Sequence, residues 1–426
     1  MAEKMKKAMI VSVGTGKEGK DIAHGICFSI RQNNPDFLIF LTTDESRKTT
    51  LPFVFDDCDR AARKPKEIKL NDPDDVEKIT LDCQGVIKGL VRDGYDLANM
   101  VVDYTSGTKA MSAGLCIASI REKVGALIYI SGKRGEGGRV ISGTERALSV
   151  VPNQIFAGDL FKEAIDSFNI YHFDVTLKIL TEARDMLSDP DFLKNIQVLE
   201  ILSKAYALWD RFEVGDAFQI LKSVREEDLL KRWGIGKQIE LNKQALYQEK
   251  EHLFCPERMF DLLENARRRG DEERKFDDAV ARLYRVCEYI GQHELNKLGL
   301  YKIKNGIPDT SDLELSKLPP HLSEKYCKYT DTHDGKAKIH LSGNYNLLFD
   351  LNHPMGNFFK ENEIHFKKLM GFRDLSILAH GFNPVSERTY KDVLELIENF
   401  IRNEKFSETD IQQRVKFPRI RIETIL

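Results

Sequence analysis

The chain has 426 residues, 42% of them hydrophobic, which is enough for two or three domains with packed cores. Its 64 basic and 67 acidic residues leave a net charge of −3, which excludes a strong overall attraction to nucleic acid or membranes. Any site for such a partner must therefore be local.

The cysteine pattern and the apolar runs indicate the cellular setting. Seven cysteines are scattered singly, so the sequence predicts neither a zinc site nor a disulfide framework. No stretch approaches the roughly 20 apolar residues of a membrane span, and the first apolar run is too short for a signal peptide. We therefore expect a reduced, cytoplasmic protein without membrane contact.

The first 150 residues alternate short β-rich runs with helical patterns. The predicted strands are 7–13, 37–43, 99–104 and 126–132. The predicted helices between them are 21–33, 75–94 and 109–123. This alternation predicts a parallel α/β sheet covered on both faces, and continuous apolar runs suit strands buried on both sides. Residues 132–151 predict a glycine turn between two short antiparallel strands that close the sheet.

From about residue 157 the pattern becomes helical, with apolar residues at steps of three and four and no fixed-period repeat. The basic run Arg267–Arg269 is expected to be a solvated helix end, with contact to RNA phosphate as the alternative. Residues 303–357 are expected to be rich in loops. A helical pair is predicted at 358–380 and 386–404. The predicted fold class is thus α/β followed by all-α.

The first glycine loop resembles a phosphate-binding P-loop whose last residue differs. From Gly14 it reads G-x-x-x-x-G-K, but Asp21 stands where a Ser or Thr hydroxyl would bind Mg²⁺. No strand that ends in an aspartate of the Walker-B type follows it clearly. Nucleotide hydrolysis is therefore an alternative that the sequence does not favour.

A second loop follows the strand that ends at Asp103. Its residues Thr105 to Lys109 lie where the next helix begins, so hydroxyls, a lysine and free backbone N–H groups together predict an anion site. Ligands bind at the carboxyl ends of strands in open α/β sheets, so we expect this loop to converge with residues 12–16 and Thr42. The alternative is a plain helix-capping turn.

The motif D-x-T-S-G-T-K-x-M at 103–111, together with S-x-G-T-G at 12–16, resembles the CARF domain of CRISPR-associated proteins. CARF domains are Rossmann-like dimeric sensors of cyclic oligoadenylates. The resemblance covers about 150 residues, and it makes a ring-phosphate contact a better reading of the first loop than an ATPase loop. The residues that it implicates in ligand binding are Ser12, Gly14, Thr15, Gly16, Thr105, Ser106, Gly107, Thr108 and Lys109.

Near the other end, Arg373 and His380 form an R-x6-H pattern. On one helix, seven residues are two turns, which places both side chains on one face about 10 Å apart. Gly381 and Pro384 predict that the helix ends there. The pair suits RNA cleavage without a metal, since an arginine can stabilise the phosphorane and a histidine can move the proton. A structural arginine with a helix-capping histidine is the alternative.

R-x4–6-H in a helical C-terminal domain is similar to the signature of HEPN ribonucleases, and CARF followed by HEPN resembles type III CRISPR accessory ribonucleases of the Csm/Csx type. The resemblance implies a homodimer in which two motifs form one site. Arg285 and His293 lie outside the spacing window and are expected to be structural. The other histidines lack carboxylates at ligand spacing, so no metal site is expected. Supporting roles are assigned to Asp374, Ser376 and Glu288, the last by orienting Arg373.

These resemblances imply three domains: a CARF sensor at 1–153, a helical connection at 154–252 and a HEPN domain at 253–426. The expected function is a metal-independent endoribonuclease of antiviral defence that cuts single-stranded RNA. No cofactor is expected. The expected allosteric activator is a cyclic oligoadenylate, the cyclic tetra-adenylate rather than the hexa-adenylate. The link to a type III CRISPR effector complex is expected to be functional, without stable association.

Two alternatives remain open. In the first, the sensor pocket cleaves the cyclic ligand as a ring nuclease and the helical end only dimerises. In the second, the protein is a non-catalytic nucleotide-responsive regulator of transcription. That reading needs a basic recognition helix, which the C-terminal helices lack.

Overall fold

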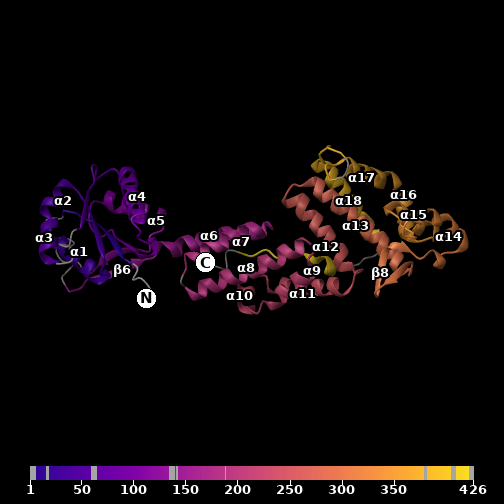
Figure 1. Ribbon diagram of the computed structural model, residues 1–426, viewed down its shortest axis with the longest axis horizontal. Coiled ribbons are helices and arrows are strands. Elements are labelled where there is room, and N and C mark those ends of the chain that lie inside the picture. Colours follow the sequence, from indigo (N-terminus) through magenta and orange to yellow (C-terminus); the bar gives the residue numbers. More distant parts are fainter. Residues whose placement is uncertain are drawn as a thin grey trace. The chain divides into compact units, whose positions relative to one another are not determined.

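The computed structural model describes residues 6–15, 19–58, 65–133, 140, 143–187, 189–378, 381–403 and 409–421. The chain forms two compact units (Figure 1). The first unit comprises Met1–Leu160 and Glu182–Asp189, and the second comprises Phe161–Thr181 and Pro190–Leu426. Within the described ranges, no helix is both long enough and apolar enough to cross a membrane.

The first unit is built on a sheet with the strand order β3-β2-β1-β4-β5-β6. Its strands are β1 Ala8–Ser12, β2 Phe37–Thr42, β3 Lys66–Lys69, β4 Met100–Asp103, β5 Ala126–Ser131 and β6 Arg146–Val150. The first five run parallel, and β6 pairs with β5 in the antiparallel sense. The predicted parallel sheet is therefore confirmed, and of the two antiparallel strands predicted at 132–151 the described residues show one, β6.

Helices cover both faces of this sheet, because alternate strand residues feed two separate cores. On β1, Ala8 and Ile10 join a cluster with residues of α4 and α5, whereas Met9 and Val11 join one with α1 and α3. The helices are α1 Gly19–Asn33, α2 Asp44–Thr49, α3 Leu51–Asp57, α4 Val76–Arg92 and α5 Lys109–Arg121. The chain order reverses between β1 and β4, which makes the carboxyl ends of these two strands the switch point of the sheet.

The second unit is mostly helical. It contains parts of α6 Pro152–Asn169 and α7 Phe173–Asp185, then α8 Pro190–Asp210, α9 Val214–Ser223, α10 Glu227–Arg232, α11 Gly236–Glu251, α12 Pro256–Arg267 and α13 Phe276–Lys297. Between α12 and α13, residues Arg268–Glu272 form the π-helical turn η2. One core of this unit is a group of stacked, tilted and edge-to-face rings formed by Phe168, Phe173, Tyr206, Trp209 and Phe417.

The prediction of a loop-rich stretch at 303–357 is wrong in part. This stretch holds most of the hairpin of β7 Tyr301–Lys304 and β8 Ile307–Leu313, and also α14 Pro320–Tyr326 and α15 Leu341–Asp350. The hairpin escaped prediction because β7 is only four residues long and β8, with the sequence IPDTSDL, contains a proline and two aspartates, which are rare in strands. In α15 the apolar side chains fall on the buried face of a helix only ten residues long.

The closing helices also differ from the prediction. The expected helix at 358–380 is divided between α16 Pro354–Glu361 and α17 Glu363–Leu375, while α18 Glu387–Asn403 matches its prediction. Because α17 ends at Leu375, the argument that one helix carries both Arg373 and His380 is wrong. A turn follows instead, in which the N–H of Gly381 donates to the carbonyl of Ser376 (3.2 Å).

The last described residues return to the middle of the second unit. After α19 Thr409–Val415, Ile420 exchanges two backbone hydrogen bonds with the side chain of Asn169 on α6, at 2.7 and 2.9 Å. The ring of Phe417 enters the aromatic core beside Tyr206, with ring centroids 4.8 Å apart. We call residues 416–421 the C-terminal strap.

Candidate functional site

The two glycine loops meet at the switch point of the sheet. The hydroxyls of Ser12 and Ser106 each donate to the other residue's carbonyl, and the N–H of Gly14 donates to Ser106 Oγ (3.3 Å). A Cβ atom on Gly14 would lie 2.8 Å from the Cα of Gly107. Gly107 itself has a φ of +109°, a backbone conformation that residues other than glycine rarely adopt. The predicted convergence of these loops is confirmed.

The hydroxyls of Thr105 and Thr108 both serve the local fold. Thr105 Oγ1 accepts the N–H of Ile130 on β5 at 2.8 Å. Thr108 is the N-cap of α5: it accepts the N–H of Met111 at 3.1 Å and donates to the carbonyl of Pro73 at 2.7 Å. The capping alternative is therefore correct for Thr108. Its contact with a ligand stays a prediction.

Asp103 is buried beneath this loop. Its Oδ1 accepts the backbone N–H of Thr105 at 2.8 Å, and only 1% of the residue is exposed. Burial raises the pKa of the Asp103 carboxyl, while hydrogen bonds from Ser29 and Thr105 oppose the rise. The carboxyl thus acts as an internal anchor for the loop, away from the exposed side where a ligand would bind.

Lys109 is the first residue of α5, and its side chain is exposed. It adds a positive charge to a helix start, where backbone N–H groups already favour an anion. Thr15 is partly exposed in the facing loop. Thr42 is buried, and its hydroxyl donates to the carbonyl of Ile68 at 3.5 Å. Gly16 lies outside the described residues. The described geometry places an exposed lysine at a helix start, and the anion site predicted there stays a prediction.

The predicted catalytic residues are described only in part. Arg373 and Asp374 lie in the last turn of α17, and their side chains are not among those described. His380 lies outside the described residues. Ser376 is 1% exposed and directly follows this helix. The roles of these four residues therefore stay predictions.

The neighbouring helix α13 holds the other residues that the sequence singled out. Glu288 accepts a hydrogen bond from Arg285 at 3.0 Å, and Arg285 also donates to Gln292 at 3.0 Å. His293 is 9% exposed and bonds to Glu294 at 2.8 Å. Arg285 and His293 thus both have partners on α13, and their expected structural role stays a prediction. The proposed contact of Glu288 with Arg373 stays a prediction.

The expectation that Arg267–Arg269 is a solvated helix end is wrong. Arg268 is 5% exposed; it donates to Asp210 at 2.9 Å and stacks on the Phe417 ring at 3.8 Å. Arg269 also pairs with Asp210. Their partners come from α8 and the C-terminal strap, which local sequence patterns do not reveal. Over the described part of the chain, no group of three or more His, Cys, Asp or Glu side chains could hold a metal ion.

Comparisons with known proteins agree with this architecture. Residues 248–404 match the family model described as the Csm6 HEPN domain. The chain is also similar to the structure of Enterococcus italicus Csm6 bound to cyclic hexa-2′-fluoro-hexa-dAMP, with a TM-score of 0.60 and 13% sequence identity. That match covers 96% of this chain and 97% of the other. No curated protein is similar enough to the chain to count as a match. The chain thus shares the fold of a Csm6, with a Rossmann-like α/β unit followed by a helical unit that contains the range matched by the Csm6 HEPN domain model.

Proposed function

We propose that the protein is an endoribonuclease that cuts single-stranded RNA and is activated by a cyclic oligoadenylate. The observation that carries this proposal is the match of residues 248–404 to the Csm6 HEPN domain. The predicted motif Arg373/His380 falls inside the matched range. In this proposal the domains are a sensor at 1–153, a connection at 154–252 and a ribonuclease at 253–426. The protein would serve type III CRISPR defence without binding the effector complex stably.

The sensor role is supported by the chemistry of the switch point. A cyclic oligoadenylate carries one phosphate per nucleotide, and the start of α5 with Lys109 presents N–H groups and a positive charge. The similar Enterococcus italicus Csm6 is bound to a cyclic hexa-dAMP analogue, which supports the ligand class. We keep the cyclic tetra-adenylate as the predicted activator and include the hexa-adenylate in the test below.

The proposed reaction needs no metal. The 2′-oxygen of the RNA attacks the adjacent phosphorus, and the bond from phosphorus to the 5′-oxygen breaks, which leaves a 2′,3′-cyclic phosphate and a 5′-hydroxyl. Arg373 stabilises the extra negative charge of the phosphorane, and His380 moves the proton. Two such motifs, one from each subunit of a homodimer, would form the site. Supporting residues in this proposal are Asp374, Ser376 and Glu288.

The test is cleavage of labelled single-stranded RNA in EDTA, with no activator, with cyclic tetra-adenylate and with cyclic hexa-adenylate. We expect cleavage to be stimulated by one ring size and to leave 2′,3′-cyclic phosphate ends. Activity that disappears in EDTA and returns with Mg²⁺ would contradict this chemistry and favour the P-loop reading. Cleavage of the cyclic ligand without cleavage of RNA would favour the ring-nuclease alternative.

A further inference from the structure

The segment that follows the R-x6-H motif is anchored to the start of α13. The N–H of Val385 donates to both carboxylate oxygens of Asp277 at 3.3 Å. Two residues later, Glu387 pairs with Arg274 at 2.8 Å. These contacts hold the chain from five residues beyond His380. Five extended residues span at most about 18 Å, so the anchor limits how far His380 can lie from Val385.

The π-helical turn η2 anchors the same segment a second time. Asp271 Oδ1 accepts the hydroxyl of Tyr390 at 3.0 Å and the ammonium of Lys391 at 2.6 Å. The fit on this side is tight, because a Cβ atom on Gly270 would lie 2.6 Å from a ring carbon of Tyr390. Tyr390 is fully buried, so η2 and the first turn of α18 are closely packed.

The opposite side of η2 contacts the middle of the second unit. Arg268 donates to Asp210 at the end of α8 (2.9 Å) and stacks on Phe417 of the C-terminal strap. Glu272 pairs with Arg419 of the same strap. The turn therefore lies between the helices of the middle region and the segment after the motif.

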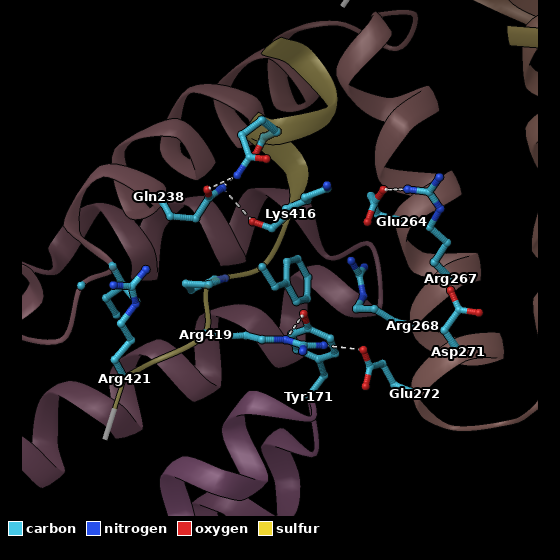
Figure 2. Close-up of a pocket in the computed structure, with 15 residues that line it drawn as sticks. Tyr171, Gln238, Glu264, Arg267, Arg268, Asp271, Glu272, Lys416, Arg419 and Arg421 are labelled. Atoms are coloured by element: carbon cyan, nitrogen blue, oxygen red, sulfur yellow. Dashed lines mark hydrogen bonds and ion pairs between the residues drawn. The ribbon is translucent and has the colours of Figure 1, made fainter. Parts of the chain in front are cut away.

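This side of η2 also borders a pocket, shown in Figure 2. The pocket has a volume of about 470 Å³, and its lining includes Arg267, Arg268, Asp271, Glu272 and Arg419. The turn is thus packed tightly toward α18, and on its other side, beside its contacts with the strap, it borders the pocket. A π-helical turn is less favourable than α-helix and often occurs at functional sites. The arrangement suits an element that shifts as a body.

We propose that η2 is a relay between the helical middle and the catalytic segment, with Asp271 as the positioning residue. Asp271 holds the start of α18 through Tyr390 and Lys391, and the Arg268–Asp210 contact ties η2 to α8. The proposal rests on the proposed ribonuclease function, because it describes how that site is positioned and regulated. Asp271 touches neither RNA nor the cyclic ligand in this scheme.

The first test compares Asp271→Ala, Asp271→Asn and Tyr390→Phe under saturating activator. We expect kcat for RNA cleavage to fall at least tenfold in Asp271→Ala, with KM for RNA and affinity for the activator within twofold of wild type. Asp271→Asn keeps an oxygen that can accept the Tyr390 hydroxyl, so it should recover part of kcat. Arg402→Gln removes an exposed ion pair with Glu398 on the same helix and should keep full activity.

A double-mutant cycle separates positioning from simple loss of packing. Because the Tyr390 hydroxyl acts through Asp271, adding Tyr390→Phe to Asp271→Ala should lower kcat no further. Wild type that fails to cut RNA would contradict the proposed function. Wild type that cuts RNA, with kcat unchanged in folded Asp271→Ala, would overturn the relay. If Asp271→Ala does not fold, Tyr390→Phe takes its place. A lower kcat for RNA cleavage in Tyr390→Phe then supports the relay, and an unchanged kcat overturns it.

The second test addresses the link to α8 with Asp210→Asn. We expect the ratio of activated to unactivated cleavage to fall at least fivefold, with unactivated cleavage within twofold of wild type. An equal fall in both rates, or an unchanged ratio, would refute the link. If this variant does not fold, Arg269→Lys is used instead, because Arg269 pairs with Asp210 and Glu273 through two different guanidinium nitrogens, a planar geometry that a lysine ammonium does not reproduce.

Discussion

Gly14 and Gly107 touch backbone to backbone, with only 2.8 Å left between a Cβ atom on Gly14 and the Cα of Gly107. This contact joins the loops after β1 and β4 where the proposed ligand would bind. Because the obstructing atoms are backbone, no side-chain rotation can make room for a methyl group. The spacing of the two loops therefore depends on glycine at position 14.

The first prediction is that Gly14→Ala separates the loops and weakens binding of the cyclic oligoadenylate at least tenfold, which is about 1.4 kcal/mol. Isothermal titration calorimetry measures this affinity. Gly25→Ala on α1 is the matched control, since its added Cβ would meet no atom within 4 Å. Equal affinities for Gly14→Ala and wild type would show that the ligand does not depend on this junction.

The second prediction concerns Lys109. Its exposed ammonium should bond to a ligand phosphate, so Lys109→Ala should weaken binding by about 1.5–3 kcal/mol, the range for hydrogen bonds to charged groups. Unactivated RNA cleavage at high protein concentration should persist. Lys88→Ala removes another exposed lysine, which pairs with Glu122, and should bind normally. An affinity unchanged in Lys109→Ala would remove this residue from the site.

The sequence predicts the buried strands of the sheet well, and of the two exposed edge strands it predicts β6 but not β3. Four strands are continuous apolar runs, so their burial can be predicted from their composition; they are β1, β2, β4 and β5. Strand β3, with the sequence KEIK, lies at the sheet edge with mostly exposed side chains and was not predicted. The sequence reveals the two glycine loops because positive φ angles and close backbone contacts favour glycine, and helix N-caps favour Ser and Thr.

The charged network of the second unit could not be predicted in the same way. Arg268 meets Asp210 across 58 residues of sequence, and its stacking partner Phe417 comes from the C-terminal strap. A local charge run gives no sign of such distant partners, so solvation was the natural but wrong expectation. The end of α17 at Leu375 was likewise missed, because Gly381 and Pro384 suggested a later stop.

The third prediction tests the composite catalytic site. If each site uses Arg373 and His380 from two subunits, His380→Ala should abolish RNA cleavage while affinity for the activator stays nearly unchanged. Heterodimers of wild type with His380→Ala should then lose most of their activity. Differently tagged subunits allow these heterodimers to be isolated and assayed. Retention of about half of the activity would refute the shared site and leave the nuclease assignment intact.

The fourth prediction follows from the buried carboxyl of Asp261. Burial raises its pKa to about 7, although the nearby Arg268 guanidinium opposes the rise. Between about pH 4 and pH 7 the folded protein keeps a proton that the unfolded chain has lost, so stability falls as pH rises. The slope from this group is about −1.4 kcal/mol per pH unit.

The variant Asp261→Asn should lack this slope, because the amide oxygen can still accept the Trp209 N–H but does not ionise. Denaturant unfolding at a series of pH values, followed by tryptophan fluorescence, measures the change of the free energy of unfolding with pH. The two tryptophans, Trp209 and Trp233, report on it because both are buried in the second unit. Asp216→Asn on the exposed face of α9 should keep the wild-type profile. If the free energy of unfolding changes with pH in the same way in wild type and in Asp261→Asn, the raised pKa of Asp261 would be contradicted.

The return of the C-terminal strap has a consequence for synthesis on the ribosome. Asn169 and its partner Ile420 are 251 residues apart in the chain. At the usual 5–20 residues per second, the ribosome needs roughly 10–50 s to make the intervening chain. During this time the aromatic core around Tyr206 lacks Phe417, and η2 lacks one of its supports. A nascent chain therefore lacks these contacts of the strap until residues 417–420 have left the ribosome.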